Sequence, residues 1–284
     1  MFRRYYYLTK PGIIYGNLLT AVAGFLLATS YPFNTALLIA TLGSIALVIG
    51  SGCVFNNYYD IDIDGVMERT KNRALVTGDI KPTNALIYGA ILGILGFGLL
   101  VFATNTVTVI VGLIGYIDYV LIYGPLKRRS VSSTIVGAVS GSTAIVTGYT
   151  AVTGRIDLAA IVLFTIMILW QVAHFNAIAI YRSNDYDSAQ IPILPSVMGM
   201  ARSIKIIVLF IFLFIVATMS LTLFGYTGYT YLFVMGAIGI SWLWAGVDGI
   251  YSLEPKIWAR KTFFYSLVVI LVFSLMTALG HRLP

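Results

Sequence analysis

Three oxygen-bearing side chains recur every four residues at the end of an apolar segment. Asn56, Asp60 and Asp64 lie in the stretch SGCVFNNYYDIDIDG, and on a helix each would lie about 40° around from the last. Carboxylates this close repel one another unless they share a cation, and hard oxygen ligands suit Mg²⁺. The spacing therefore predicts a magnesium site formed by Asn56, Asp60 and Asp64, with Asp62 pointing elsewhere. The alternative is a solvated acidic end of a helix.

Basic side chains follow this acidic stripe at once. A metal site beside a cluster of cations is suited to a diphosphate, which bridges the metal and gives its remaining charge to the basic groups. We expect the cations of this clamp to be Arg69, Lys71 and Arg73, joined by Lys127, Arg128 and Arg182 from later segments. Lys127 and Arg128 could instead serve only to orient the chain in a membrane.

A second group of residues ends a later apolar segment, WQVAHFNAIAIYRSND. If a helix continues to residue 185, then Trp170, His174, Tyr181 and Asp185 share one face. An imidazole inside an apolar span is costly and often functional. His174 could ligate a metal or haem iron, act as a base, bind a substrate carboxylate, or only hydrogen-bond a neighbouring helix. Asp185, at the membrane edge, could help to hold a second metal.

The composition identifies the elements that must position these residues. Of 284 residues, 59% are hydrophobic and only 10% are charged, whereas a soluble domain carries roughly 25% charged residues. A soluble globule is therefore excluded, and we expect an all-α integral membrane protein with one domain over residues 1–284. Nine stretches are long enough to span a bilayer as helices: 13–30, 35–58, 83–103, 106–124, 131–151, 157–182, 203–224, 228–249 and 262–281.

The basic residues predict the orientation of these spans. All of the 18 lysines and arginines except Arg155 and Arg282 fall on one side of the predicted topology. Because cytoplasmic loops carry the excess of positive charge, we expect a cytoplasmic N-terminus, a C-terminus outside, and both motifs on the cytoplasmic side. The net charge of +7 is then explained by these loops, and we expect no nucleic-acid partner.

At this point the motifs resemble a known family. Asn56-x3-Asp60-x3-Asp64, followed by Met67 to Arg73, is similar to the first aspartate motif of the UbiA superfamily of intramembrane prenyltransferases. The segment from His174 to Pro195 resembles the branch of that superfamily that forms haem O. The resemblance implies nine helices around a lateral, lipid-accessible cavity, with the diphosphate held under a cytoplasmic cap.

The resemblance also implies a reaction and its residues. Farnesyl diphosphate would give its farnesyl group to the 2-vinyl group of haem B, producing haem O and diphosphate. Asp60, Asp64, His174 and Asp185 would be catalytic, with Mg²⁺ held by Asn56 and the three aspartates. Tyr181 and the six cations would bind the substrates. The implied setting is the bacterial inner membrane, supplying a haem–copper terminal oxidase.

Three alternatives remain open from the sequence. The acceptor could be a quinone-type aromatic compound instead of haem. The chain could be a haem-binding protein of oxidase assembly without catalysis. It could also be a secondary transporter, although binding residues of transporters sit near the midplane on broken helices, whereas these residues lie at a boundary.

Overall fold

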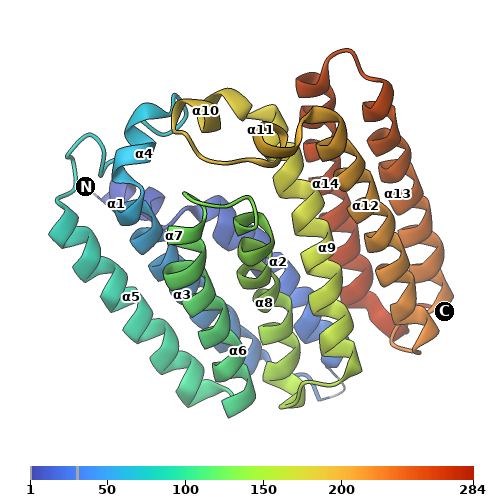
Figure 1. Cartoon of the computed structure of the whole chain (residues 1–284). Helices are drawn as coiled ribbons and strands as arrows, with labels where there is room; N and C mark the ends of the chain where they lie inside the picture. Colours follow the sequence, from blue (N-terminus) through green and yellow to red (C-terminus); the bar gives the residue numbers. More distant parts are fainter. Residues whose placement is uncertain (1, 30–31) are drawn as a thin grey trace.

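The computed structural model describes residues 2–29 and 32–284, and these residues form a bundle of helices (Figure 1). Within this part of the chain, nine segments are long and apolar enough to cross a membrane, as predicted. The predicted end of the first span, residue 30, lies outside the described residues. The spans are α2 (Pro11–Ala28), α3 (Thr35–Tyr59), α5 (Pro82–Ala103), α6–α7 (Thr106–Leu126), α8 (Ser133–Thr153), α9 (Leu158–Tyr181), α12 (Met200–Leu223), α13 with the following 3-10 turn (Tyr229–Tyr251) and α14 (Pro255–Leu279).

Local sequence signals explain where several spans begin. The side chains of Asn34, Asn105 and Asp157 each accept a hydrogen bond from a backbone N–H in the first turn of the following helix, at 2.9 to 3.2 Å. These bonds satisfy N–H groups that no carbonyl of the helix can reach. Other spans start with a proline, which needs no such partner.

Four short helices lie at one end of the bundle. They are α1 (Phe2–Leu8), α4 (Ile61–Val66), α10 (Ser183–Ser188) and α11 (Leu194–Met198). Figure 1 shows α4, α10 and α11 together above the ends of the long helices. The loops that carry them pack on each other through a small apolar cluster, Met67, Ala179, Ile191 and Ile193. The segment 60–81, which carries α4, and the segment 182–199, which carries α10 and α11, thus form one cap.

The backbones of α2 and α8 touch at two glycines. A Cβ atom at Gly24 would lie 2.1 Å from the carbonyl oxygen of Ile145, and one at Gly148 would lie 2.0 Å from that of Ala21. No real side chain fits at such distances, so both positions require glycine. Close approach through small residues is a common way of packing helices in lipid, where apolar burial offers little driving force between helices.

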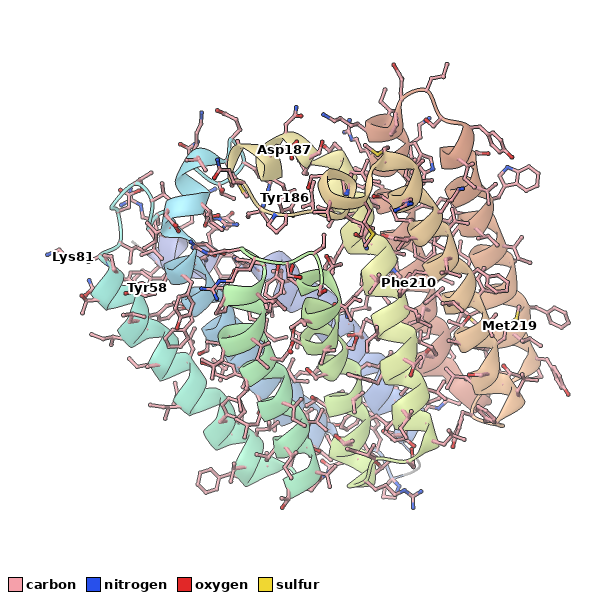
Figure 2. All side chains as sticks on the ribbon, viewed as in Figure 1. Tyr58, Lys81, Tyr186, Asp187, Phe210 and Met219 are labelled. Atoms are coloured by element: carbon pink, nitrogen blue, oxygen red, sulfur yellow. The ribbon has the colours of Figure 1, made fainter. Side chains whose placement is uncertain are left out.

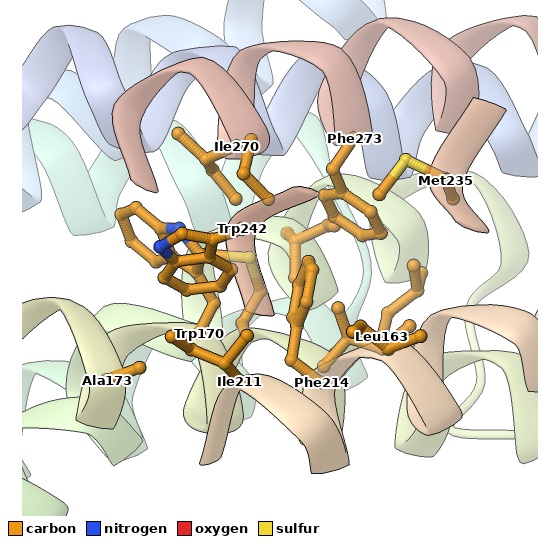
Figure 3. Packing of buried hydrophobic residues seen from close by; sticks show 14 of the residues in the cluster. Leu163, Trp170, Ala173, Ile211, Phe214, Met235, Trp242, Ile270 and Phe273 are labelled. Atoms are coloured by element: carbon orange, nitrogen blue, oxygen red, sulfur yellow. The ribbon is translucent and has the colours of Figure 1, made fainter. Parts of the chain in front are cut away.

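The largest apolar core holds α9 against α12, α13 and α14. Phe214 packs edge-on against Trp242 at 5.6 Å and against Phe273 at 6.2 Å between ring centres. Figure 3 shows these rings beside Trp170 and Ala173 of α9. Because such packing is dense and leaves few alternative arrangements, it fixes the register of α9 relative to α14. This register also determines where His174, the residue after Ala173, lies against α14.

Candidate active site

The acidic stripe is assembled much as its spacing predicts. The helix α3 ends at Tyr59, yet the N–H of Asp60 donates to Asn56 O at 3.1 Å and that of Asp64 to Asp60 O at 2.7 Å. These bonds preserve the four-residue repeat across the junction with α4. Asn56, Asp60 and Asp64 are all buried, with 3 to 4% of each residue exposed.

Each buried carboxylate is paired with a cation from another segment. Lys127 Nζ donates to Asp60 Oδ2, and Arg73 Nη1 donates to Asp64 Oδ2. Burial lowers the pKa of Lys127, while the charge of Asp60 opposes that shift. A buried charge costs several kcal/mol unless it is paired and hydrogen-bonded. The two pairs therefore bring Lys127 and Arg73 to the predicted site as neutralising partners.

Asp62 and Arg128 form a separate pair at the exposed edge of this site. Two nitrogens of Arg128 donate to the two oxygens of Asp62, both at 2.7 Å, and Arg128 also donates to the carbonyl of Tyr59. The Arg128 guanidinium holds the pKa of Asp62 at about 2. Arg128 also lies 3.8 Å from Asp60 Oδ1. This arginine thus lies beside the stripe, and Asp62 points away from it as expected.

A helical irregularity positions Lys127, the lysine that pairs with Asp60. The last turns of the span leading to Lys127 form a π-helix, Asp118–Tyr123, just before Pro125. Because the proline ring clashes with the carbonyl four residues earlier and offers no N–H, the preceding turn widens. The rings of Tyr119 and Tyr123 stack at 5.5 Å, and Lys127 Nζ lies 5.6 Å from the Tyr123 ring.

Lys10 is a site residue that sequence reasoning missed. Its Nζ donates to Asn56 Oδ1 at 2.5 Å, and burial lowers its pKa to about 8. Its backbone has a φ of +52°, in the left-handed region that costs a lysine energy. This conformation lies between α1 and Pro11, where the chain turns into α2. The strained backbone and the buried ammonium together indicate a functional position, whereas the sequence indicated only an orienting charge.

The N-terminal helix is tied to the same cluster. Arg73 Nη1 also donates to Asn57 Oδ1 at 3.0 Å, and Asn57 Nδ2 donates to the carbonyl of Leu8 at 2.8 Å. The arginine that neutralises Asp64 is therefore linked to the end of α1 through a single amide side chain. Nothing in the spacing of these residues indicated this link.

The second motif differs from its prediction in one respect. Helix α9 ends at Tyr181, and the chain turns at Arg182 into α10, so Asp185 does not continue the face of His174. Among the described residues, no three His, Cys, Asp or Glu side chains form a metal-binding group. Asp185 therefore does not join Asp60 and Asp64 in one cluster, and its role stays a prediction.

Tyr186 joins the two halves of the cap. It lies on α10 beside Asp187, as Figure 2 shows. Burial raises the pKa of Tyr186, while the nearby charges of Arg69 and Arg182 lower it. The charges of the predicted cations Arg69 and Arg182, which lie on different loops, thus both act on Tyr186. Neither the sequence spacing nor the charge pattern indicated Tyr186.

Two other predicted binding residues lie farther from the stripe. Lys71 is exposed and pairs with exposed Glu68 at 2.7 Å, so the structure does not bring it to the buried carboxylates. Tyr181 has the guanidinium of Arg182 4.4 Å from its ring centre and that of Arg260 5.7 Å away. Tyr181 therefore lies at a cationic surface at the end of α9.

His174 lies inside the bundle, seven residues before the end of α9. Its Nδ1 is 2.6 Å from Ser266 Oγ of α14, and its ring stacks on Trp170 at 4.6 Å. The helix therefore places Trp170 and His174 on one face, as predicted. Only 8% of His174 is exposed.

The residues at the stripe fit a magnesium ion. The donors are the carboxylate and amide oxygens of Asn56, Asp60 and Asp64, which are hard ligands. Among the described residues, the acceptor Asp60 Oδ1 is buried without a hydrogen-bond partner. A carboxylate oxygen left without a hydrogen bond in a buried site is available to a cation.

A nine-span bundle with a buried acidic stripe, facing cations and a polar cap defines an intramembrane prenyltransferase. The model of the UbiA prenyltransferase family matches residues 17–268, and the chain belongs to this family. The chain is similar over its whole length to protoheme IX farnesyltransferases. That of Citrobacter koseri is 47% identical, with 100% of this chain and 96% of the relative covered. That of Yersinia enterocolitica is 46% identical with the same coverage.

Solved structures share the fold. A digeranylgeranylglyceryl phosphate synthase matches with a TM-score of 0.82 at 19% identity, covering 98% of each chain. A UbiA homolog from Archaeoglobus fulgidus, bound to GPP and Mg²⁺, matches with a TM-score of 0.73 at 16% identity, covering 97% of this chain and 99% of the other. The protein is therefore a multi-pass membrane protein with the UbiA fold.

Proposed function

We propose that the protein transfers the farnesyl group of farnesyl diphosphate to the 2-vinyl group of haem B, giving haem O and diphosphate. The observation that carries this proposal is the similarity of 47% over the whole chain to a protoheme IX farnesyltransferase. The buried pairs Asp60–Lys127 and Asp64–Arg73 support the diphosphate half of the reaction. His174, in its aromatic surroundings, supports the haem half.

The cationic residues act where negative charge develops. As the allylic C–O bond breaks, the diphosphate takes the bonding electrons. Lys127, Arg73 and Lys10 already point into the stripe, and preorganised donors of this kind are worth more in a dry site than in water. Mg²⁺, held by Asn56, Asp60 and Asp64, supplies further positive charge to the leaving group when bound. Arg69, Arg128 and Arg182 line the cap side.

The other half of the reaction makes two bonds on the acceptor. C1 of the farnesyl cation bonds to the terminal carbon of the vinyl group, and the adjacent carbon becomes cationic. A water molecule adds there and releases a proton, which completes the hydroxyethylfarnesyl side chain. The cap of α10 and α11 over the loop of α4 is suited to excluding bulk water until the first bond has formed.

The location follows from the same chemistry. We place the protein in the bacterial inner membrane with the N-terminus, the cap and the active site on the cytoplasmic side, because nearly all basic residues lie at that end. Asp185 and Lys71 then lie in the cytoplasmic loops as outer substrate contacts. Haem O would pass from here to a haem–copper terminal oxidase.

The direct test uses the purified full chain in lipid with haem B, farnesyl diphosphate and Mg²⁺, and follows the haem products by mass. We expect a haem that has gained farnesyl plus water, and we expect its formation to be lost in Asp60→Ala. The matched control is Asp79→Ala, which removes an exposed carboxylate that pairs with Arg4.

One result would contradict haem as the acceptor, and another would contradict the role of Asp60 in the metal site. Unmodified haem from active, folded protein would remove haem as the acceptor, and quinone precursors would be tried next. Equal loss of activity in Asp60→Ala and Asp79→Ala would place the effect in protein stability instead of the metal site.

A further inference from the structure

The hydrogen bonds around Ser266 determine which nitrogen of His174 carries its proton. Ser266 Oγ lies 2.5 Å from the carbonyl oxygen of Phe263 and 2.6 Å from His174 Nδ1. A carbonyl oxygen only accepts, and a hydroxyl has one hydrogen to donate. That hydrogen is therefore used on Phe263 O, as is common for a serine inside a helix. Ser266 Oγ must then accept from His174, so Nδ1 carries the proton.

The other ring nitrogen is left with its lone pair. A neutral imidazole protonated at Nδ1 has an unprotonated Nε2, which is the form that binds metals. In the part of the chain that the structure describes, Nδ1 alone of the two ring nitrogens makes a hydrogen bond. Histidines that ligate metals almost always donate their other N–H to a fixed acceptor, which orients the ring and raises its basicity. Ser266 provides this acceptor.

The ring of His174 is also held from the sides. Trp170 stacks on it with 20° between the ring planes, and Phe263 lies 4.9 Å from its centre. Trp170 Nε1 donates to the backbone carbonyl of Ser266 at 2.9 Å. One residue of α14 therefore fixes both the imidazole and the indole that stacks on it. Such double support is more than a single bond between helices requires.

We propose that Ser266 is a positioning residue that holds His174 as an axial ligand of the haem iron through Nε2. This inference rests on the proposed function, since it names how the acceptor is held. His174 lies seven residues before the end of α9, which places its Cα about 10 Å along the helix from that end. A histidine is a usual protein ligand of haem iron. The indole of Trp170 is stacked on the imidazole and so supports the ligand ring itself.

The test measures haem binding without farnesyl diphosphate or Mg²⁺, so that it does not depend on turnover. Wild-type protein in lipid is titrated with haem and with iron-free protoporphyrin IX, and the iron–imidazole vibration is recorded by resonance Raman spectroscopy. We expect haem to bind at least about tenfold more tightly than the iron-free ring. We expect His174→Ala to lose the vibration and this preference, and free imidazole to restore the vibration.

The role of Ser266 is tested by three variants. Ser266→Ala should weaken haem binding about tenfold and shift the iron–imidazole vibration, because Nδ1 loses its acceptor. Ser266→Thr keeps the hydroxyl and should restore both. The matched control is Ser274→Ala on the same helix, a residue that is 1% exposed and whose hydroxyl has no hydrogen-bond partner within residues 2–29 and 32–284. This control should leave the vibration unchanged.

Equal wild-type affinity for haem and the iron-free ring would overturn the proposal, even if no variant folded. So would an iron–imidazole vibration that persists in His174→Ala without added imidazole, or an identical effect of Ser266→Ala and Ser274→Ala. Failure of the proposed function is a different result. In that case the wild-type protein would bind haem through His174 and leave it unmodified when farnesyl diphosphate and Mg²⁺ are added.

Discussion

The two halves of the candidate site stabilise their buried polar groups in different ways. At the end of α3, four buried or partly buried charges form two pairs, and every partner comes from a different loop or helix end. At the seam of α9 and α14, a neutral imidazole is held by a hydroxyl and aromatic rings within the spans. Full charges lie where loops can bring counter-charges and water, whereas the polar group inside the spans is an imidazole, which can stay neutral.

This difference predicts that the halves bind their substrates independently. The charged half should govern the prenyl diphosphate, and the neutral half should govern the acceptor. Each of the following substitutions tests that division.

The largest effect is expected from Asp64→Asn. It removes the charge that pairs with Arg73 and one oxygen ligand for Mg²⁺, so kcat/KM should fall roughly hundredfold or more. Haem affinity should not change, and parallel titrations with each substrate will measure both. A similar weakening of haem binding would show that the two halves are not separate. Asp62→Asn, at the exposed edge, is the matched control.

His174→Ala should have the opposite pattern. We expect turnover of haem to fall at least about tenfold, because the acceptor is no longer held. The affinity for farnesyl diphosphate, measured by calorimetry with Mg²⁺, should stay within a factor of about two of the wild-type value. A matching drop in that affinity would contradict the division.

Gly24→Ala tests the helix packing on which both halves of the site depend. Helix α2 packs against α3, α8 and α14, so it supports both sites. The added methyl group would lie 2.1 Å from Ile145 O, and the overpacking should lower stability by about 2 kcal/mol. Haem binding and prenyl diphosphate binding should then be lost together in thermal inactivation assays. Gly16→Ala on the same helix meets nothing within 4 Å and should change neither.

The smallest effect concerns acid stability. In the folded protein Arg128 lowers the pKa of Asp62 from 3.8 to about 2, so this pair stabilises the fold above about pH 4. That contribution should disappear as the pH falls from about 4 to about 2. Because the side chain of Asp62 is 66% exposed, it should amount to less than about 1 kcal/mol. In Asp62→Asn the melting temperature should change less with pH over this range than in the wild type. A loss of several kcal/mol in the stability of this variant at neutral pH would contradict the prediction.

Much of the fold could be predicted from sequence because apolar length is a local property. The nine spans follow from it, and the stripe of Asn56, Asp60 and Asp64 follows from a four-residue repeat that survives the helix junction. The end of α9 at Tyr181 lies within one residue of the predicted end of the span at 182. The turn at Arg182 into α10, which takes Asp185 off the face of His174, could not be predicted because it depends on how the cap packs.

Contacts between residues far apart in the chain could not be predicted from the sequence. The pairing of Lys127 with Asp60 was expected only as a shared diphosphate site, and Lys10 and Ser266 were not expected at all. Their roles arise from contacts between helices far apart in the chain. A lysine before a proline and a serine in an apolar span carry no local signal of such contacts.

The link from Arg73 through Asn57 to the carbonyl of Leu8 has a practical consequence. Any ligand that draws Arg73 away from Asp64 also loosens the amide that secures α1. Occupancy of the buried site would thus be transmitted to the outermost helix of the chain. A fluorescent label on α1 would report substrate arrival without touching the site, and a bulky group fused to α1 would disturb it.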